Sequence, residues 1–350
     1  MTVDALLSAG HRVAAPAPRF DHLLAMTDAI GTFEHAEHTA ARRDHGYCTD
    51  DMARVLMVVV REPHPSRPVI ALGRTAMRFL AAAQGVAGDA RNRCDVEGRW
   101  CDRTGVEDCW GRSIAAFGAA ANRGHDEWMR QTAMSAFGHA VQQRSVHVHA
   151  MAFAALGAAD VLHANPHHYG ARALLGDAID AIGRPTDDPA WPWTEPRLTY
   201  ANATLAEALL AAGHALDRPD VVDDGCALLG WLLARETVDG HLSPTPVGGS
   251  GPGDAAARFD QQPIEAAAMA DACARAEAVT GDPSWGRGVD LAVGWFLGDN
   301  DIGAVMWDVE TGGGYDGLHA RGPNLNQGAE STLALISTLQ HARDRSLAVR

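Results

Sequence analysis

Residues 44–54 concentrate side chains that could carry out acid–base chemistry. Asp50 and Asp51 are adjacent carboxylates, Tyr47 precedes them, and Arg54 follows about one helical turn later. The stretch lies where a polar loop becomes an apolar helix, and negative charge is favoured there because the first backbone N–H groups of a helix lack helical partners. Helix capping alone would account for one such stretch. A functional role becomes more attractive because similar stretches recur along the chain.

Several other long polar loops also end in carboxylates at a predicted helix start. The side chains that we expect at the same end of the fold are Asp108, Trp110 and Arg112, then Trp193, Tyr200 and Asn202, then Asp260, Gln261, Gln262 and Glu265, and finally Tyr315, Asp316, Asn324, Gln327 and Glu330. Carboxylates and amides can hydrogen-bond to adjacent sugar hydroxyls, and aromatic faces cover the apolar face of a pyranose. The set therefore predicts an oligosaccharide site, although Trp193 could equally be a hydrophobic plug.

Two of these carboxyl groups are the preferred catalytic candidates. Hydrolysis of a glycosidic bond needs one acid to protonate the leaving oxygen and one carboxylate to activate water or attack the anomeric carbon. Asp50 fits because two adjacent carboxylates repel each other unless something uses them. Glu265 fits because a glutamate on a helix of small apolar residues is costly to bury, and burial raises the pKa of an acid. An ion pair between Glu265 and a neighbouring arginine is the structural alternative, while Asp108, Asp260 and Glu330 share the same topology.

Composition restricts the partners of the chain. It has 350 residues, 47% of them apolar, and a formal net charge of -15, which argues against binding nucleic acid or an anionic membrane surface. The longest apolar run, residues 55–60, is too short to span a bilayer, and no secretion signal is evident, so we predict a cytoplasmic protein. The six cysteines include no CxxC pair, and we expect reduced thiols with no metal or cofactor.

Helical periodicity dominates the chain from residue 20 onward. Some segments carry one apolar stripe, as at Leu72, Ala76, Phe79 and Ala83, whereas others, such as 205–216, are small or apolar on all sides and predict enclosed helices. We predict striped helices at residues 20–30, 67–84, 126–143, 168–183, 220–235 and 284–297. We predict enclosed helices at residues 51–61, 107–121, 147–162, 200–214, 261–279 and 327–343.

The linkers between these helices alternate in length. Links from enclosed to striped helices are short, as at 62–65, whereas links from striped to enclosed helices are long, as at 85–106, with 144–146 as the exception. The alternation predicts an all-α fold, an (α/α)6 barrel of six outer and six inner helices with long loops at the active-site mouth. An open α-solenoid is the alternative, but it would not need loops this long or this varied. Short hairpins are expected inside the loops at 241–243 and 304–307.

Several motifs resemble signatures of a bacterial family of (α/α)6-barrel glycosidase-like proteins. They are residues 44–51, 191–195, 259–265, 312–317 and 326–330. The resemblance covers residues 19–341, and within the family the chain is similar to mycobacterial endo-α-mannosidases that act on methylmannose polysaccharide. It implies a cytoplasmic glycoside hydrolase that cleaves internal α-(1→4)-mannosidic bonds, with Asp50 and Glu265 at the catalytic positions. We expect one catalytic domain over 19–345, preceded by a flexible leader over 1–18.

Other functions on the same fold are possible. A non-catalytic carbohydrate-binding barrel would keep the groove without the chemistry, and a glycosidase or transglycosidase could act on a different sugar. A sugar epimerase would be expected to use paired histidines on inner helices, and no well-placed pair is evident. A terpene cyclase would need an apolar aromatic cavity, and a glycosyltransferase would be expected to contain a nucleotide-binding βαβ unit, which the sequence does not indicate.

Overall fold

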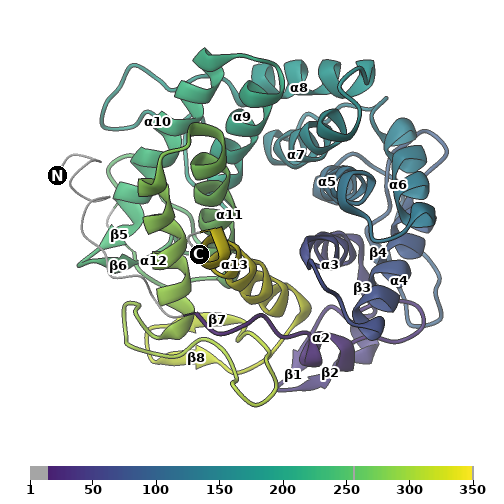
Figure 1. Ribbon diagram of the computed structural model, residues 1–350. Coiled ribbons are helices and arrows are strands. Elements are labelled where there is room, and N and C mark those ends of the chain that lie inside the picture. The colour runs from purple at the N-terminus through teal and green to yellow at the C-terminus, as the bar shows by residue number, and fades with distance from the viewer. Residues whose placement is uncertain (1–14, 255–256, 349–350) are drawn as a thin grey trace.

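The computed structural model describes residues 15–254 and 257–348, and most of this part of the chain forms two concentric rings of helices (Figure 1). The inner helices are α3 (Thr49–Arg61), α5 (Asp108–Arg123), α7 (Val148–Ala164), α9 (Ala203–Ala215), α11 (Pro263–Thr280) and α13 (Ala329–Ala348). The outer helices are α2 (Asp21–Ala25), α4 (Arg67–Ala83), α6 (Glu127–Ala140), α8 (Tyr169–Ile182), α10 (Pro219–Glu236) and α12 (Gly286–Leu297). The fold is therefore the predicted (α/α)6 barrel.

Contacts between the inner helices close the ring. Each inner helix packs against the next one along the chain, and α13 packs against both α11 and α3. An open solenoid would leave its first and last helices without that contact, so the alternative architecture is excluded. The apolar core fills the space between the two rings, and it includes both the striped faces of the outer helices and the small side chains of the inner ones.

The sharpest close approach lies between the inner helices α5 and α7. A Cβ added to Gly118 would lie 2.1 Å from the carbonyl oxygen of Gly157, and a Cβ added to Gly157 would lie 2.1 Å from that of Ile114. Backbone cannot move aside as a flexible side chain can. Glycine at both positions is therefore what allows the two helix backbones to come together.

Replacing Gly118 by alanine is expected to lower the free energy of unfolding by about 3 kcal/mol, because the added methyl group overpacks this backbone contact. Urea unfolding followed by circular dichroism would measure the change. Gly138→Ala on α6 is the matched control, since no heavy atom lies within 4 Å of its added Cβ. That control should be slightly stabilising, because alanine is the better helix former. Equal effects of the two substitutions would contradict this explanation.

The first outer helix is shorter than predicted. A helix was expected over 20–30, but α2 ends at Ala25. The Asp28 side chain explains the difference because its Oδ1 accepts hydrogen bonds from the backbone N–H groups of Ile30, at 2.9 Å, and Gly31, at 3.3 Å. Such local bonds compete with the helical ones and fold the chain into a turn. The predicted leader over 1–18 lies mostly outside the described residues.

Four two-stranded sheets lie in the long loops of the described part of the chain, three of them hairpins and one, β3–β4, a pairing between two distant loops. They are β1–β2 (Ala36–Glu37, Ala40–Ala41), β3–β4 (Tyr47–Cys48, Arg93–Cys94), β5–β6 (Thr237–Val238, His241–Leu242) and β7–β8 (Gly317–His319, Gly322–Asn324), and each pair is antiparallel. The hairpin predicted at 241–243 is confirmed. The one predicted at 304–307 is reduced to a single bridge between Trp307 and Gly314. None of the helices in the described ranges has the length and apolarity needed to cross a membrane.

Candidate active site

The N-terminal ends of four inner helices meet at one cavity of about 1120 Å³. First-turn residues of α3, α5, α11 and α13 all reach it, and the long loops surround them. The lining residues that the sequence predicted are Asp50, Asp51, Arg54, Asp108, Arg112, Tyr200, Gln262, Asp316 and Glu330. Because the positive ends of the helix dipoles face this space, carboxylates are stabilised here. Acidic groups from separate inner helices thus gather at one mouth.

Asp50 lies on the cavity wall beside a cation. Its Oδ1 is 3.4 Å from Nε of Arg112, and this oxygen has no hydrogen-bond partner among the described residues. The Arg112 guanidinium is itself stacked on the Phe153 ring, with its carbon 3.8 Å from the ring centre. Burial, with the nearby charge of Arg54, lowers the pKa of Arg112. Asp50 therefore lines the cavity while its Oδ1 is buried beside the Arg112 guanidinium without a hydrogen bond to any described residue.

Arg54 joins two other carboxylates of the site. Its guanidinium lies 2.7 Å from Oδ1 of Asp51 and 2.7 Å from Oε2 of Glu330. Asp51 is buried and also accepts a hydrogen bond from the Cys48 thiol at 3.1 Å. Burial raises the pKa of Asp51 to about 7, although the charge of Arg54 opposes that shift. Asp51 is held by structural contacts, whereas Glu330 is more exposed and faces the cavity.

Replacing Arg54 by methionine is expected to reduce the free energy of unfolding by about 3 kcal/mol at neutral pH, because it leaves the buried Asp51 without a cation. The loss should shrink as the pH falls below about 7, where Asp51 becomes neutral. Urea unfolding at several pH values would measure both effects. Arg74→Met is the matched control, since its ion pair with Asp126 joins an arginine side chain that is 50% exposed. Exposed pairs contribute about 1 kcal/mol or less, so equal losses in the two variants would contradict the assignment.

Asp108 and Tyr200 connect the second and fourth long loops across the cavity. The Tyr200 hydroxyl donates a hydrogen bond of 2.7 Å to Oδ2 of Asp108. The Tyr200 ring stacks on His149, with ring centres 4.5 Å apart, and Nδ1 of His149 lies 4.0 Å from Glu195. Burial and the negative charge of Asp108 raise the pKa of Tyr200. The phenol therefore stays protonated and donates its hydrogen bond to Asp108.

Glu265 lies in the first turn of α11 but does not line the cavity. Its Oε1 accepts a hydrogen bond of 2.6 Å from the Ala201 backbone N–H, and its Oε2 lies 3.4 Å from the backbone nitrogen of Asn202. The side chain is buried, and no arginine pairs with it among the described residues. Burial, with the charges of Glu236 and Glu330, raises its pKa to about 8. Glu265 is thus a protonated acid at neutral pH, placed behind the segment that carries Tyr200.

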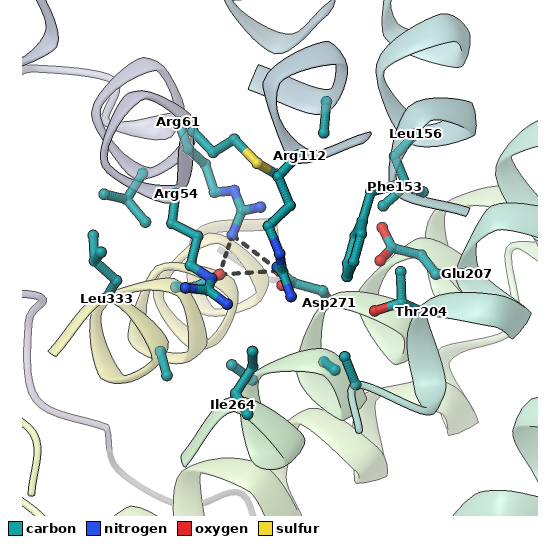
Figure 2. Close-up of a pocket in the computed structure, with 18 of the residues that line it drawn as sticks. Arg54, Arg61, Arg112, Phe153, Leu156, Thr204, Glu207, Ile264, Asp271 and Leu333 are labelled. Atoms are coloured by element: carbon teal, nitrogen blue, oxygen red, sulfur yellow. Dashed lines mark hydrogen bonds and ion pairs between the residues drawn. The ribbon is translucent and has the colours of Figure 1, made fainter. Parts of the chain in front are cut away.

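Below the mouth a narrow, mostly apolar chamber continues inward along the ring axis (Figure 2). Arg54 and Arg112 line both spaces and mark the passage between them. In Figure 2, Arg61 points into the chamber, where it forms ion-pair contact with Asp271 at 3.1 Å. Many of the remaining lining side chains are apolar, including Phe153. The polar mouth is therefore the part suited to binding sugar hydroxyls.

The other predicted site residues lie outside the lining of this cavity. Tyr47, Trp110, Trp193, Asn202, Gln261 and Gln327 are buried, Tyr315 packs against the core, Asp260 is exposed and pairs with His319, and Asn324 is half-buried in β8. The aromatic residues contribute large apolar areas to the core, although the indole nitrogen of Trp193 has no hydrogen-bond partner among the described residues. The Tyr47 hydroxyl donates to Asp28 at 2.7 Å, and the Trp193 ring stacks on Trp231. Trp193 is therefore the hydrophobic plug that the sequence left open.

The amides of Gln261 and Gln327 are used within the protein. Oε1 of Gln261 accepts a hydrogen bond of 2.8 Å from the Trp295 indole, and its Nε2 donates to Asp301 at 2.6 Å. Nε2 of Gln327 donates to Asp308 at 3.1 Å. Each amide thus forms hydrogen bonds with other groups of the protein and is not free to bind a ligand. They position the loops around the mouth.

Sequence reasoning missed part of the lining. The cavity also includes Glu34, His35, Cys48, Arg93, Pro263, Ile264, Gly328 and Ser331. Glu34 and His35 precede the 44–54 stretch in the same long loop, and their polarity next to Phe33 was the available signal. Arg93 reaches the site because β4 pairs with β3, and a pairing between distant loops leaves no mark in a single sequence.

Glu34, Cys48 and Asp51 form a compact acidic group, with ligand atoms within 4.8 Å of one another. Protein cations already neutralise both carboxylates, because Arg93 pairs with Glu34 and Arg54 pairs with Asp51. Burial also raises the pKa of the Cys48 thiol, which disfavours the thiolate that a metal would need. The group therefore fits a hydrogen-bonded wall better than a metal site.

Solved structures of low sequence identity share this fold. A sugar epimerase from a ruminal bacterium superposes with a TM-score of 0.67 at 10% identity, over 97% of this chain and 98% of that one. A D-mannose isomerase gives 0.62 at 12% identity, over 98% and 97% of the two chains. An α-amylase from Clostridium perfringens gives 0.57 at 10% identity, over 92% and 96%. No protein-family model matches the sequence, and no curated protein matches it.

Proposed function

We propose that the protein is a carbohydrate-active enzyme, specifically a glycoside hydrolase that cleaves internal α-(1→4)-mannosidic bonds of methylmannose polysaccharide. The observation that carries the proposal is the gathering of Asp50, Asp108 and Glu330 from three inner helices at one mouth. The epimerase, isomerase and amylase folds described above support a sugar substrate, and the resemblance in residues 19–341 supports the linkage and the sugar. Among the described residues that line the mouth, His35 is the only histidine, which favours carboxyl chemistry over a histidine pair.

In this proposal Asp50 is the carboxylate that activates water or attacks the anomeric carbon. The Asp50 side chain lines the mouth, and its Oδ1 lies 3.4 Å from Nε of Arg112. The hydrogen-bonding groups around it would hold the sugar hydroxyls, with Asp108, Gln262 and Glu330 on different sides. Neutral sugars fit such a mixture of acceptors and donors better than a charged ligand does.

Glu265 is proposed as the acid that protonates the leaving oxygen. A carboxyl group with a pKa of about 8 is protonated at neutral pH, as this role requires. Because Glu265 lies behind Ala201 and Asn202, the role requires the loop segment before α9 to shift when substrate binds. Glu330, which lines the mouth directly, is the acid to compare with it.

Incubation of the protein with α-(1→4)-linked mannose oligomers, with and without 3-O-methyl groups, tests the function. Chromatography should show shorter chains with new reducing ends, and internal cleavage should give products of intermediate length from the start. Chains of unchanged length that nevertheless bind would favour a non-catalytic carbohydrate-binding barrel. Chains of unchanged length with an altered reducing-end sugar would favour an epimerase or isomerase. If only glucose oligomers are cleaved, the protein is a hydrolase but its substrate is a glucose polymer and not a mannose polymer.

A further inference from the structure

A second cavity of about 640 Å³ adjoins the mouth on the other side of Asp50. Asp50, Arg93 and Asp108 line both cavities, so these side chains form the divide between them. The mouth cavity lies on the side of Glu330, and the second cavity lies on the side of the long loop between α4 and α5. An oligosaccharide bound across Asp50 would therefore have one end in the mouth cavity and the other end in the second cavity.

The second cavity contains charged groups that the protein itself does not use. Within the described ranges, the side chains of Arg103 and Glu107 form no hydrogen bond or ion pair, although both line this cavity. Many other arginines near the site are paired, as Arg54 is with Asp51. An unpaired cation and an unpaired carboxylate that face the same cavity are available to a ligand.

Asn92 adds a fixed donor close to Asp50. Its Oδ1 accepts a hydrogen bond of 3.1 Å from the backbone N–H of Thr49, the residue that precedes Asp50. The amide group is therefore tied to the start of α3, and its Nδ2 has no partner among the residues that the structure describes. A donor held in this way is preorganised for a hydroxyl oxygen near the reacting bond.

The loop that carries these groups is held rigidly. Both carboxylate oxygens of Asp102 accept backbone hydrogen bonds, from Asn92 at 2.6 Å and from Arg93 at 3.1 Å. Pairing of Cys48 with Arg93 then fixes this loop to the strand that leads into α3. The second cavity is thus built onto the same element as Asp50, and its position relative to Asp50 is set by backbone contacts.

We infer that this second cavity is a sugar subsite, and that Asn92, Arg103 and Glu107 bind the hydroxyl groups of the residue that lies beyond Asp50. The inference rests on the proposed function. It names the residues that would make the enzyme require a substrate long enough to extend beyond Asp50. Guanidinium donors and a carboxylate acceptor can each bind adjacent hydroxyl groups of a neutral sugar. A chain with sugars on both sides of Asp50 is cleaved internally, whereas a chain that ends at Asp50 cannot use this cavity.

A graded series of α-(1→4)-linked mannose oligomers tests the subsite. We would measure KM and kcat for each length, and Kd by calorimetry on the Asp50→Asn background, for Arg103→Ala and Glu107→Gln. Both variants should raise KM and Kd for the long oligomers by about tenfold, the loss expected for one hydrogen bond to a charged group, and should shift the cleavage positions. Oligomers too short to reach the second cavity should be affected much less. Arg67→Ala, an exposed arginine on α4 without an ion pair among the described residues, is the control and should change neither quantity.

The outcomes separate this inference from the proposed function. If the unmodified protein cleaves the oligomers but both variants behave like Arg67→Ala at every length, the subsite assignment is wrong and the hydrolase remains. An equal loss at all lengths would also overturn the subsite, because it would indicate a general disturbance of the site. If the unmodified protein binds the oligomers but does not cleave them, the proposed hydrolase function is wrong, and the length dependence of Kd still tests the subsite. If no oligomer binds, both the proposed function and the subsite are wrong.

Discussion

Replacing Asp50 by asparagine is expected to lower kcat by about 10³-fold or more while changing the Kd for the oligosaccharide by less than about threefold. Asparagine keeps the shape and the hydrogen-bonding oxygen but cannot act as a base or a nucleophile. The neighbouring carboxylates Asp108 and Glu330 remain available to bind hydroxyl groups. Release of new reducing ends measures the first quantity, and calorimetry measures the second.

Thermal unfolding distinguishes loss of a catalytic group from loss of folding in the Asp50→Asn variant. Asp50 forms an ion pair at 3.4 Å with the buried Arg112, so its replacement should lower the thermal unfolding temperature moderately while the protein stays folded at the assay temperature. Asp180→Asn, an exposed position on α8, controls for the change of charge. Full activity of Asp50→Asn would remove Asp50 from the reaction, and a large fall in unfolding temperature would show that the loss reflects folding.

The ring was predictable because its signal is local and repeated. The outer helix α4 carries one apolar stripe, at Leu72, Ala76 and Phe79, and the inner helix α9 is small or apolar nearly all round. The inner helix α3 is itself amphipathic, so its place in the inner ring followed from the alternation of linker lengths as well as from periodicity. The carboxylates at the mouth were predictable for a related reason. Asp50 and Glu330 lie in the first turn of inner helices, and a helix start fixes the end of the barrel at which a side chain emerges.

The positions of the aromatic and amide side chains were not predictable in the same way. Trp110 and Gln261 have types that suit a sugar site, but their polar atoms bind partners that are distant in sequence, namely the Ala140 carbonyl and the Trp295 indole. Whether such a group faces a ligand or the core depends on those tertiary partners. The strand pairing that brings Arg93 to the mouth, between β3 and β4, is also a contact between distant loops. Residue type therefore did not indicate which of these side chains line the mouth.

Replacing Glu265 by glutamine is expected to lower kcat by about 10²- to 10³-fold, because glutamine cannot supply the proton for the leaving oxygen. The protein with Glu265 intact should lose kcat/KM as the pH rises through about 8, since the acid acts only while it is protonated. Rates measured across pH would show this alkaline limb. The comparison variant is Glu330→Gln, which removes a carboxyl group that lines the mouth directly.

Stability measurements distinguish a proton donor from a buried structural acid. The pKa of Glu265 is raised from 4.5 to about 8, so its neutral form contributes stability that is fully present below about 4.5 and is lost as the pH rises through about 8. Glutamine at this position should reduce that pH dependence, with the remainder due to other buried carboxyls such as Glu236, whose pKa burial raises to about 7. Urea unfolding between these pH values measures the difference.

The two readouts together decide the assignment. If Glu265 donates the proton, Glu265→Gln reduces both the rate and the pH dependence of stability, whereas Glu330→Gln leaves the alkaline limb in place. If Glu265 only holds the backbone of Ala201 and Asn202, glutamine changes stability and leaves kcat nearly unchanged. In that case, loss of the alkaline limb in Glu330→Gln would transfer the role to Glu330, whose carboxyl already faces the substrate cavity. The two carboxyl groups compared in this way lie at the same end of the barrel, Glu330 exposed to the cavity and Glu265 buried behind it.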